Sequence, residues 1–170
     1  ALLLARMPAE DAAPIFERLE EHEQEEIAEQ MPPESVALIA SEMAPDDRAD
    51  LFSILPPGMA EDVLETLERV DPEAAEELQE IAQYPETSAG HLMTTWYVST
   101  APTATIEQAF GAVREFAEKT HTPVYNVHAL SSDGRLTGIV SLRELIVAAK
   151  DGTGRPIDEL LRTNVISVTP

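Results

Sequence analysis

The amino-terminal half of the chain contains three similar stretches spaced 24 residues apart: Met7-Pro8-Ala9-Glu10, Met31-Pro32-Pro33-Glu34 and Leu55-Pro56-Pro57-Gly58. Apolar positions that follow keep the same spacing, in the two sets Leu19, Met43, Leu67 and Ile27, Leu51, Ala75. A proline is tolerated in the first turn of a helix, because its missing N–H would have no partner there. Each repeat is therefore predicted to form two short helices.

A period of this length is typical of a helical solenoid, in which one helix pair cannot bury its apolar face alone and stacks on the next pair. We therefore expect residues 1–82 to form an all-α helical-repeat superhelix of antiparallel pairs without any strand. The sequence Asp71-Pro72-Glu73 predicts one further helix start, with Asp71 as its cap. About three repeats are visible, which is near the minimum for independent stability, so we expect further chain to cap the first repeat.

Charge also divides the 170 residues into two regions. Residues 1–90 contain 24 acidic and 4 basic residues, a net charge of −20, whereas residues 91–170 contain 8 and 7, a net charge of −1. Binding to nucleic acid requires clustered Lys and Arg, so the acidic region excludes a nucleic-acid partner. Cations are its natural partners. A solvated helical surface or a halophilic source is the alternative, but a halophilic protein would be acidic throughout.

The carboxyl-terminal half alternates short β-rich runs with amphipathic helices. We expect the order strand, helix, strand, strand, helix, with strands only after residue 95. Capping boxes begin both helices, Thr105 with Gln108 and Ser141 with Glu144. The expected elements are a helix over 106–118, strands over 124–130 and 136–140, a helix ending near Ala149, a helical turn over 157–161 and a strand over 165–168.

The junction between the halves reads Tyr84-Pro85-Glu86 and then Ala89-Gly90-His91-Leu92-Met93-Thr94. Further on, Asp133-Gly134-Arg135-Leu136 leads through Gly138 to Ser141-Leu142-Arg143-Glu144-Leu145-Ile146. The first stretch resembles the junction of MgtE-type magnesium transporters, which carries an Ala-Gly-x-Leu-Met-Thr signature. The second resembles the end of a CBS motif, which closes in that family with Ser-Leu-Arg-Asp-Leu-Ile. With the helical repeat, the resemblance covers essentially the whole chain.

This resemblance implies a mixed fold, an all-α helical-repeat superhelix followed by an α/β CBS module. The implied domains are an acidic helical-repeat domain over 1–82, a linker over 83–94, a CBS motif over 95–163 and the first strand of a second, truncated CBS motif over 164–170. The implied place is the cytoplasmic side of the cell membrane, attached to the transmembrane pore domain of the same full-length chain. The implied assembly is a homodimer through the CBS modules.

The function that the resemblance implies is sensing of Mg²⁺, or of other divalent cations, and closure of the pore when cations bridge acidic domain faces. Asp46, Asp47 and Asp50 resemble the acidic segment that contributes metal ligands in the family, and Asp46 and Asp50 share one helical face. Mg²⁺ keeps several waters and needs only one or two carboxylates. Alternatively, Asp46 or Asp47 caps a helix. The run Glu20–Glu29 is interpreted as a solvated face.

CBS modules often bind adenine nucleotides, and an aspartate normally contacts the ribose at the position of Glu144. The resemblance makes Arg143 a candidate phosphate ligand and Tyr125 and Asn126 candidates for the base pocket. The alternative for Glu144 is the reciprocal cap to Ser141. The four histidines show no paired metal-binding spacing and are interpreted as surface or packing residues: His22, His91, His121 and His128.

No catalytic motif is present in the sequence: there is no glycine-rich phosphate loop, no Gly-x-Ser-x-Gly elbow, no His-Glu-x-x-His and no cysteine. We therefore do not expect an enzyme. Three classes of function remain open, the gating region of a Mg²⁺ transporter, a soluble CBS protein that senses adenine nucleotides, and a structural helical-repeat scaffold. A multi-span segment elsewhere in the full-length chain distinguishes the first class from the other two.

Overall fold

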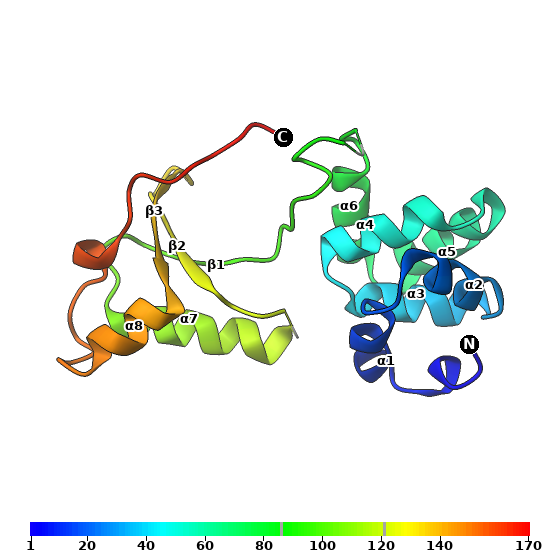
Figure 1. Ribbon diagram of the computed structural model, residues 1–170, viewed down its shortest axis with the longest axis horizontal. Helices are drawn as coiled ribbons and strands as arrows, with labels where there is room; N and C mark the ends of the chain where they lie inside the picture. The colour runs from blue at the N-terminus through cyan, green and yellow to red at the C-terminus, as the bar shows by residue number, and fades with distance from the viewer. Residues whose placement is uncertain (86, 121) are drawn as a thin grey trace. The chain divides into compact units, whose positions relative to one another are not determined.

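The computed structural model describes residues 1–85, 87–120 and 122–170, in two compact units, residues 1–95 with 169–170 and residues 96–168 (Figure 1). The helices of the first unit are η1 (Leu4–Arg6), α1 (Ala9–Phe16), α2 (Glu21–Glu29), α3 (Pro33–Glu42), α4 (Pro45–Ile54), α5 (Pro57–Val70) and α6 (Pro72–Ile81). The second unit contains β1 (Val98–Thr100), α7 (Ile106–Lys119), β2 (Asn126–Leu130), β3 (Leu136–Ser141), α8 (Leu142–Ala149) and η2 (Asp158–Leu160). None of the helices described here is long and apolar enough to cross a membrane.

The 24-residue repeat of the sequence is a repeat of helices. Helices α1, α3 and α5 begin at residues 9, 33 and 57, and α2 and α4 begin at residues 21 and 45. Helix α5 is longer, with 14 residues, so α6 begins at residue 72, three residues later than the period predicts. The described residues before 95 contain no strand, and the first strand begins at Val98, as predicted.

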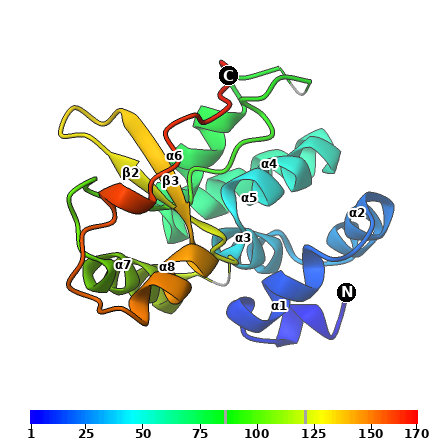
Figure 2. The same ribbon diagram turned by 60° about the vertical axis from the view of Figure 1, so that its left-hand side comes forward.

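The six helices pack in two rows, which can be followed in Figure 2. Helix α1 contacts α3 and α3 contacts α5, while α2 contacts α4 and α4 contacts α6. Residues at equivalent positions of the repeats are buried between the rows, including Met43 and Leu67 at one position and Leu51 and Ala75 at another. This stacking explains why the apolar positions recur every 24 residues, because each helix buries its apolar face against the apolar face of its neighbour. A superhelical course stays a prediction.

Proline and capping residues define where these helices begin. Helices α3, α4, α5 and α6 each have a proline at the first helical positions. Asp71 caps α6 as predicted, because its Oδ1 accepts a hydrogen bond of 3.0 Å from the backbone N–H of Ala74. The side chain therefore satisfies one of the donors that the first turn leaves without a partner.

The second unit is built on a three-stranded sheet in the order β1-β2-β3. Strands β1 and β2 are parallel and are joined through α7, whereas β2 and β3 form an antiparallel hairpin. Gly134 has a φ of 78° in the hairpin turn, a conformation that favours glycine. Helices α7 and α8 contact each other and pack on the sheet (Figure 1), burying Ile106, Leu145 and Ile157.

Both predicted capping boxes are present in the second unit, and the expected helices and the hairpin strands form within two residues of their predicted bounds. The predicted helical turn is the 3₁₀ helix η2. The CBS assignment itself stays a prediction.

The strand expected over residues 165–168 is wrong for this structure, where residues 163–170 carry neither helix nor strand. A strand requires a neighbour with which to exchange backbone hydrogen bonds. The part of the chain that the structure describes supplies no ladder partner for this segment, and its Ile166 is 96 % exposed. Residues that favour strands therefore do not form one here, because the segment lacks a strand to pair with among the described residues. The expectation of a second CBS motif over 164–170 stays untested.

Candidate functional site

The acidic candidates lie on the first two turns of α4. The residue that precedes this helix is Ala44, and no side chain caps it. Asp46 and Asp47 lie within the first turn, so the alternative interpretation of either residue as the cap is wrong. Negative charge is stabilised at this end of a helix by the helix dipole. Asp50 follows one turn later and is exposed, while Asp46 and Asp47 are half-buried.

The surroundings of Asp47 and Asp50 disfavour their charged forms. The pKa of Asp47 is raised, first by burial and then by repulsion from Asp46 and Asp50. The pKa of Asp50 is also raised, first by the partial desolvation of its otherwise exposed side chain and further by repulsion from Asp46 and Glu21. Asp46 has a buried Oδ1 atom without any hydrogen-bond partner among the described residues. A cation placed beside these oxygens would relieve both the repulsion and the unsatisfied acceptor.

The structure places His91 beside Asp50. Its side chain is 10 % exposed, and its Nε2 lies 3.8 Å from Asp50 Oδ1, which lowers the pKa of Asp50 against the larger effect of burial. Its Nδ1 is buried without a hydrogen-bond partner among the described residues. Sequence analysis interpreted His91 as a surface or packing residue. The contact depends on folding, because the two residues are far apart in the chain.

The neighbouring Gly90 explains part of the junction motif. A Cβ atom at Gly90 would lie 2.5 Å from Cγ of Tyr84, so the tyrosine ring packs directly over the glycine backbone. The backbone N–H of His91 donates a 3.4 Å hydrogen bond to Ser88 Oγ. These contacts hold the segment that carries His91. Glu86, which belongs to the same motif, lies outside the described residues.

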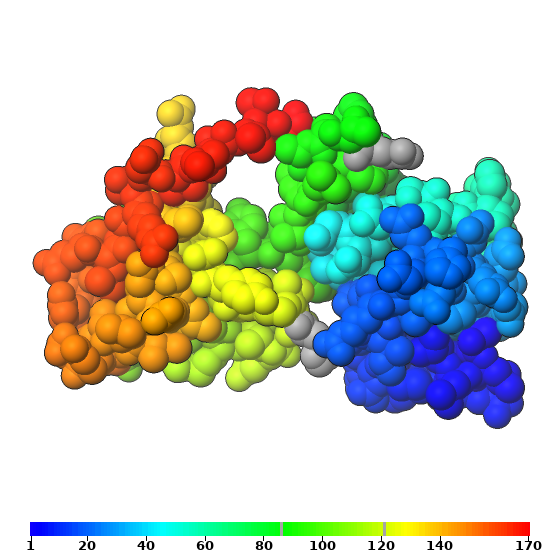
Figure 3. Space-filling model, in the orientation of Figure 1, coloured from blue at the N-terminus to red at the C-terminus, as the bar shows by residue number. Residues whose placement is uncertain are grey.

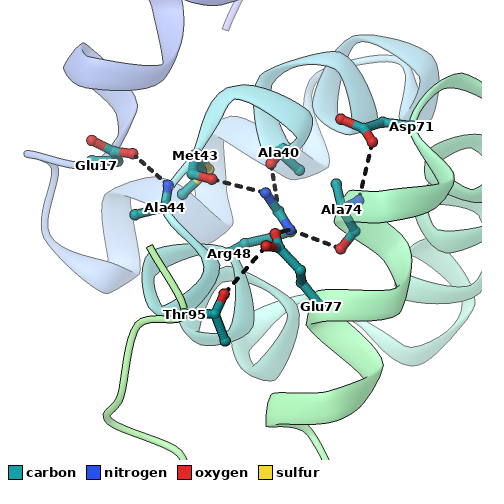
Figure 4. A network of polar contacts seen from close by, with 9 residues as sticks. All are labelled: Glu17, Ala40, Met43, Ala44, Arg48, Asp71, Ala74, Glu77 and Thr95. Atoms are coloured by element: carbon teal, nitrogen blue, oxygen red, sulfur yellow. Dashed lines mark hydrogen bonds and ion pairs between the residues drawn. The ribbon is translucent and has the colours of Figure 1, made fainter. Parts of the chain in front are cut away.

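Arg48 lies on the buried side of α4 and is fully inaccessible to solvent (Figure 4). Its guanidinium donates to three backbone carbonyl oxygens, those of Ala40 at 2.8 Å, Met43 at 2.9 Å and Ala74 at 2.7 Å. It also forms an ion pair of 3.2 Å with Glu77, whose other carboxylate oxygen accepts from Thr95 Oγ1 at 3.2 Å. Burial lowers the pKa of Arg48, and Glu77 opposes that change. Arg48 thus joins α4 to α3 and α6.

A second carboxylate holds the beginning of α4. Glu17, which follows α1, accepts a 3.3 Å hydrogen bond from the backbone N–H of Ala44 through its Oε1 (Figure 4). The backbone N–H that precedes α4 is therefore bound by a residue that follows α1, and not by the aspartates of α4. Asp46 and Asp47 remain without a capping task.

The metal-binding prediction can be compared with what Mg²⁺ requires. Nowhere in residues 1–85, 87–120 and 122–170 do three or more His, Cys, Asp or Glu side chains form a group that could hold a metal ion. Mg²⁺ usually keeps several waters and takes one or two carboxylates from the protein. The Asp46 and Asp50 side chains fit that partial role. Asp46, Asp47 and Asp50 as metal ligands stay a prediction.

Helix α2 carries the other acidic run, and its carboxylates face solvent. The glutamates over 21–29 are exposed, and Glu20 and Glu23 form a capping box at the start of the helix. These observations agree with the interpretation of the run as a solvated face.

The second unit contains a cavity of about 560 Å³ beside α8. Ten residues line it: Ser141, Arg143, Glu144, Val147, Ala148, Lys150, Asp151, Arg155, Leu160 and Arg162. Of the four candidates for nucleotide binding, Arg143 and Glu144 are in the lining and Tyr125 and Asn126 are not. The side chain of Tyr125 is exposed, while its backbone oxygen accepts from the N–H of Leu142. Lys150, Arg155 and Arg162 are lining residues that sequence analysis missed.

Glu144 is held by Ser141 and Arg162. Its Oε2 accepts from the N–H of Ser141 at 3.0 Å and from the hydroxyl of Ser141 at 2.6 Å, so the capping alternative is confirmed. Its Oε1 accepts from Arg162 Nη2 at 2.7 Å. The hydrogen bonds from Ser141, followed by those from Arg162, lower the pKa of Glu144 to about 2. Glu144 is therefore a carboxylate with both oxygens engaged.

His22 and His128, the other histidines that the structure describes, do not form a metal site with each other. His22 is exposed on α2, and the Nδ1 of His128 lies 3.1 Å from the backbone oxygen of Val98. His128 also makes an edge contact with the ring of Tyr97. His121 lies outside the described residues.

Comparison with solved structures shows the fold of the whole chain. The crystal structure of the cytosolic domain of the Mg²⁺ channel MgtE in complex with ATP aligns with a TM-score of 0.82 and 30 % identity, covering 98 % of this chain and 66 % of that one. The crystal structure of the soluble part of a magnesium transporter aligns with a TM-score of 0.84 and 28 % identity, covering 97 % and 62 %. The present fold is thus that of an MgtE cytosolic domain.

Curated relatives agree with this result. The chain is 38 % identical over 79 residues to magnesium transporter MgtE of Thermus thermophilus, covering 46 % of this chain and 17 % of the relative. It is 34 % identical over 96 residues to magnesium transporter MgtE of Enterococcus faecalis, covering 56 % and 20 %. The chain therefore spans a fifth or less of these relatives, which are transporters and not enzymes. The family model described as the MgtE intracellular N domain matches residues 1–87, and the chain accordingly belongs to this family.

Proposed function

We propose that this chain is the Mg²⁺-sensing and gating region of a magnesium transporter. It acts on the cytoplasmic side of the cell membrane, is joined to the transmembrane pore domain of the same full-length chain, and dimerises through CBS modules. The observation that carries the proposal is the start of α4, where Asp46 has a buried oxygen without a partner and Asp47 and Asp50 have raised pKa values. The names of the relatives supply the identity of the ion.

The mechanism follows from charge. Residues 1–90 have a net charge of −20, so this surface repels other acidic surfaces when no divalent cation is bound. Hydrated Mg²⁺ at Asp46 and Asp50 neutralises part of that charge and bridges acidic domain faces, which closes the pore. Because cations bind the closed form preferentially, the closed form is stabilised by mass action. Other divalent cations with oxygen ligands, such as Ca²⁺ or Mn²⁺, act in the same way.

The experiment compares the whole cytoplasmic part of the full-length chain with and without millimolar Mg²⁺. Small-angle scattering is expected to give a smaller radius of gyration with Mg²⁺, and limited proteolysis is expected to be slower. A radius of gyration that is unchanged by Mg²⁺ would contradict the sensing function and leave the fold intact.

A second candidate function is binding of an adenine nucleotide in the second unit. Two observations favour it, the cavity of about 560 Å³ lined by Arg143 and Glu144, and the likeness to a cytosolic domain that was crystallised in complex with ATP. If nucleotide sensing were the main function, the chain would act as a soluble CBS protein. Titration with ATP in buffer containing a chelator tests this function separately from Mg²⁺ sensing, and an absence of heat and of any ATP-dependent thermal shift would exclude it.

A further inference from the structure

The cavity of the second unit differs in charge from the rest of the chain. The whole chain has a net charge of −21, but four of the seven Lys and Arg residues in 96–168 line this cavity. The lining includes two acidic residues, Glu144 and Asp151, so its formal charge is +2. A protein with a strongly negative net charge repels anions in general. An anion that binds this chain must therefore be attracted locally.

Two of the four basic residues are already paired. Arg162 donates to Glu144 at 2.7 Å, and Arg155 forms ion pairs with Asp151 at 4.0 Å and with Glu159 at 3.0 Å. In the part of the chain that the structure describes, Arg143 and Lys150 have no ion-pair partner. They lie seven residues apart along α8 and its carboxyl-terminal end, about two helical turns, so they are on the same side of the helix. Their charges remain available to a ligand.

The contacts of Glu144 oppose the role that the family resemblance assigns to it. A carboxylate offers about four acceptor positions, two on each oxygen, and the two hydroxyl groups of a ribose would together occupy two of them. Glu144 already accepts two hydrogen bonds from Ser141 on Oε2 and one from Arg162 on Oε1, which leaves one acceptor position for a ribose hydroxyl. The backbone of Arg162 is held beside β3, because its N–H donates to the C=O of Ile139 at 2.8 Å and its C=O accepts from the N–H of Ile139 at 3.1 Å. A Cβ at Gly138 would lie 3.0 Å from the backbone oxygen of Arg162, so this glycine allows the close approach.

We propose that this cavity recognises its ligand as a polyphosphate anion, through Arg143 and Lys150, and that the Arg162–Glu144 ion pair competes with the ribose for Glu144. This inference rests on the proposed nucleotide binding and specifies its chemistry. The cavity is formed by α8 and by residues 150–162, which lie next to each other in orange and orange-red in Figure 3. An inorganic oligophosphate is then as good a ligand as a nucleoside triphosphate.

The test is a set of calorimetric titrations of the chain in low salt with a chelator, using ATP, inorganic tripolyphosphate and adenosine. We expect ATP and tripolyphosphate to bind with dissociation constants within about threefold of each other, and adenosine not to bind. Both affinities are expected to fall steeply with salt, because the attraction is electrostatic. Stronger binding of ATP by tenfold or more, or binding of adenosine, would overturn the inference while leaving nucleotide binding established. If tripolyphosphate binds and ATP does not, the nucleotide function is rejected. If neither anion binds, the nucleotide function and the polyphosphate inference are both rejected.

Two kinds of variant make the test specific. Arg143→Gln and Lys150→Gln are each expected to weaken the binding of ATP and of tripolyphosphate by roughly tenfold, which is the effect of losing one charge-assisted contact. Arg114→Gln is the matched control, because Arg114 is exposed on α7, has no ion-pair partner among the described residues and does not line the cavity. An equal loss of affinity in Arg114→Gln would show that the anions respond only to the overall charge of the protein, and would contradict binding at Arg143 and Lys150.

Glu144→Gln separates the two modes of recognition. Glutamine keeps the capping box with Ser141, so the fold is expected to persist, and a thermal unfolding curve checks this. Removing the negative charge also releases the guanidinium of Arg162. We expect ATP and tripolyphosphate to bind more tightly by the same factor. A weaker affinity for ATP with an unchanged affinity for tripolyphosphate would show that Glu144 binds the ribose and would refute the inference.

Discussion

Replacing Arg48 by methionine is expected to destabilise the helical unit substantially. Methionine has an unbranched side chain that can occupy most of the space of the arginine stem, so little is lost in packing. What is lost is the guanidinium, which is fully buried and donates to Ala40, Met43 and Ala74 and pairs with Glu77. The change therefore isolates the polar contacts of one side chain.

The magnitude follows from the groups left behind. Removing one partner of a buried ion pair costs about 3–5 kcal/mol. The lower end applies here, since the side chain of Glu77 is 21 % exposed and keeps its hydrogen bond with Thr95. The carbonyl oxygen of Ala40 also keeps a bond from the N–H of Met43. We therefore expect a loss of about 3 kcal/mol in the free energy of unfolding.

Urea unfolding followed by far-ultraviolet circular dichroism measures this loss. With a slope of about 1.5 kcal/mol/M, the midpoint of the helical unit is expected to fall by about 2 M. Arg69→Met is the matched control, because Arg69 is exposed and donates only a long hydrogen bond, of 3.4 Å, to Thr66 Oγ1 among the described residues. The free energy of unfolding of this variant is expected to fall by no more than about 0.5 kcal/mol. Adding Glu77→Gln to Arg48→Met is expected to recover part of the stability, because it removes a partly buried negative charge that has lost the Arg48 guanidinium. A loss below about 1 kcal/mol for Arg48→Met would refute the reasoning.

Three further predictions concern single positions. Asp71→Ala is expected to reduce the free energy of unfolding by about 1 kcal/mol in urea titrations, since α6 loses its cap. Asp71→Asn is expected to keep most of this stability, because asparagine also caps helices. Gly90→Ala is expected to lower the melting temperature, because its Cβ would overlap the ring of Tyr84, and an unchanged melting temperature would contradict that contact. The folded pKa of Glu144, about 2, is below its ordinary value of 4.5, so its contribution to stability is present above pH 4.5 and is lost as the pH falls toward 2. Acid titration of Glu144→Gln is expected to lack this component, and identical acid-unfolding profiles for the variant and the natural chain would disprove it.

The helices of the first unit could be predicted from the sequence because the information is local and repeated. Proline at the helix starts, the Asp71 cap and the apolar register are properties of short stretches, and all reappear in the structure. The longer α5 did not follow from the period, because nothing in the repeat fixes where a helix ends. The strand expected over 165–168 failed for the opposite reason, since a strand depends on a neighbour and not only on its own residues.

The site was predictable only in part. The position of Asp46, Asp47 and Asp50 on one helix followed from spacing, but the partners of that helix did not. Arg48 stands between the acidic residues in the sequence and faces the interior in the fold, where it bonds to two other helices. His91 meets Asp50 only after the chain has folded back, so no local motif could have indicated it. In the second unit, Arg162 reaches Glu144 through a backbone contact with β3 that the sequence does not reveal.

Calorimetric Mg²⁺ titration of two double variants tests whether Asp46 and Asp50 bind the cation directly. One is Asp46→Asn with Asp50→Asn, and the control is Glu25→Gln with Glu29→Gln on the exposed face of α2. Both remove two negative charges four residues apart, so general screening predicts equal effects. We predict that the α4 variant weakens Mg²⁺ binding by roughly tenfold, the loss of about 1.4 kcal/mol, and that the α2 variant changes it by less than about twofold. Titration curves of the two variants that overlay would contradict the site, because the acidic unit would then act only through its total charge.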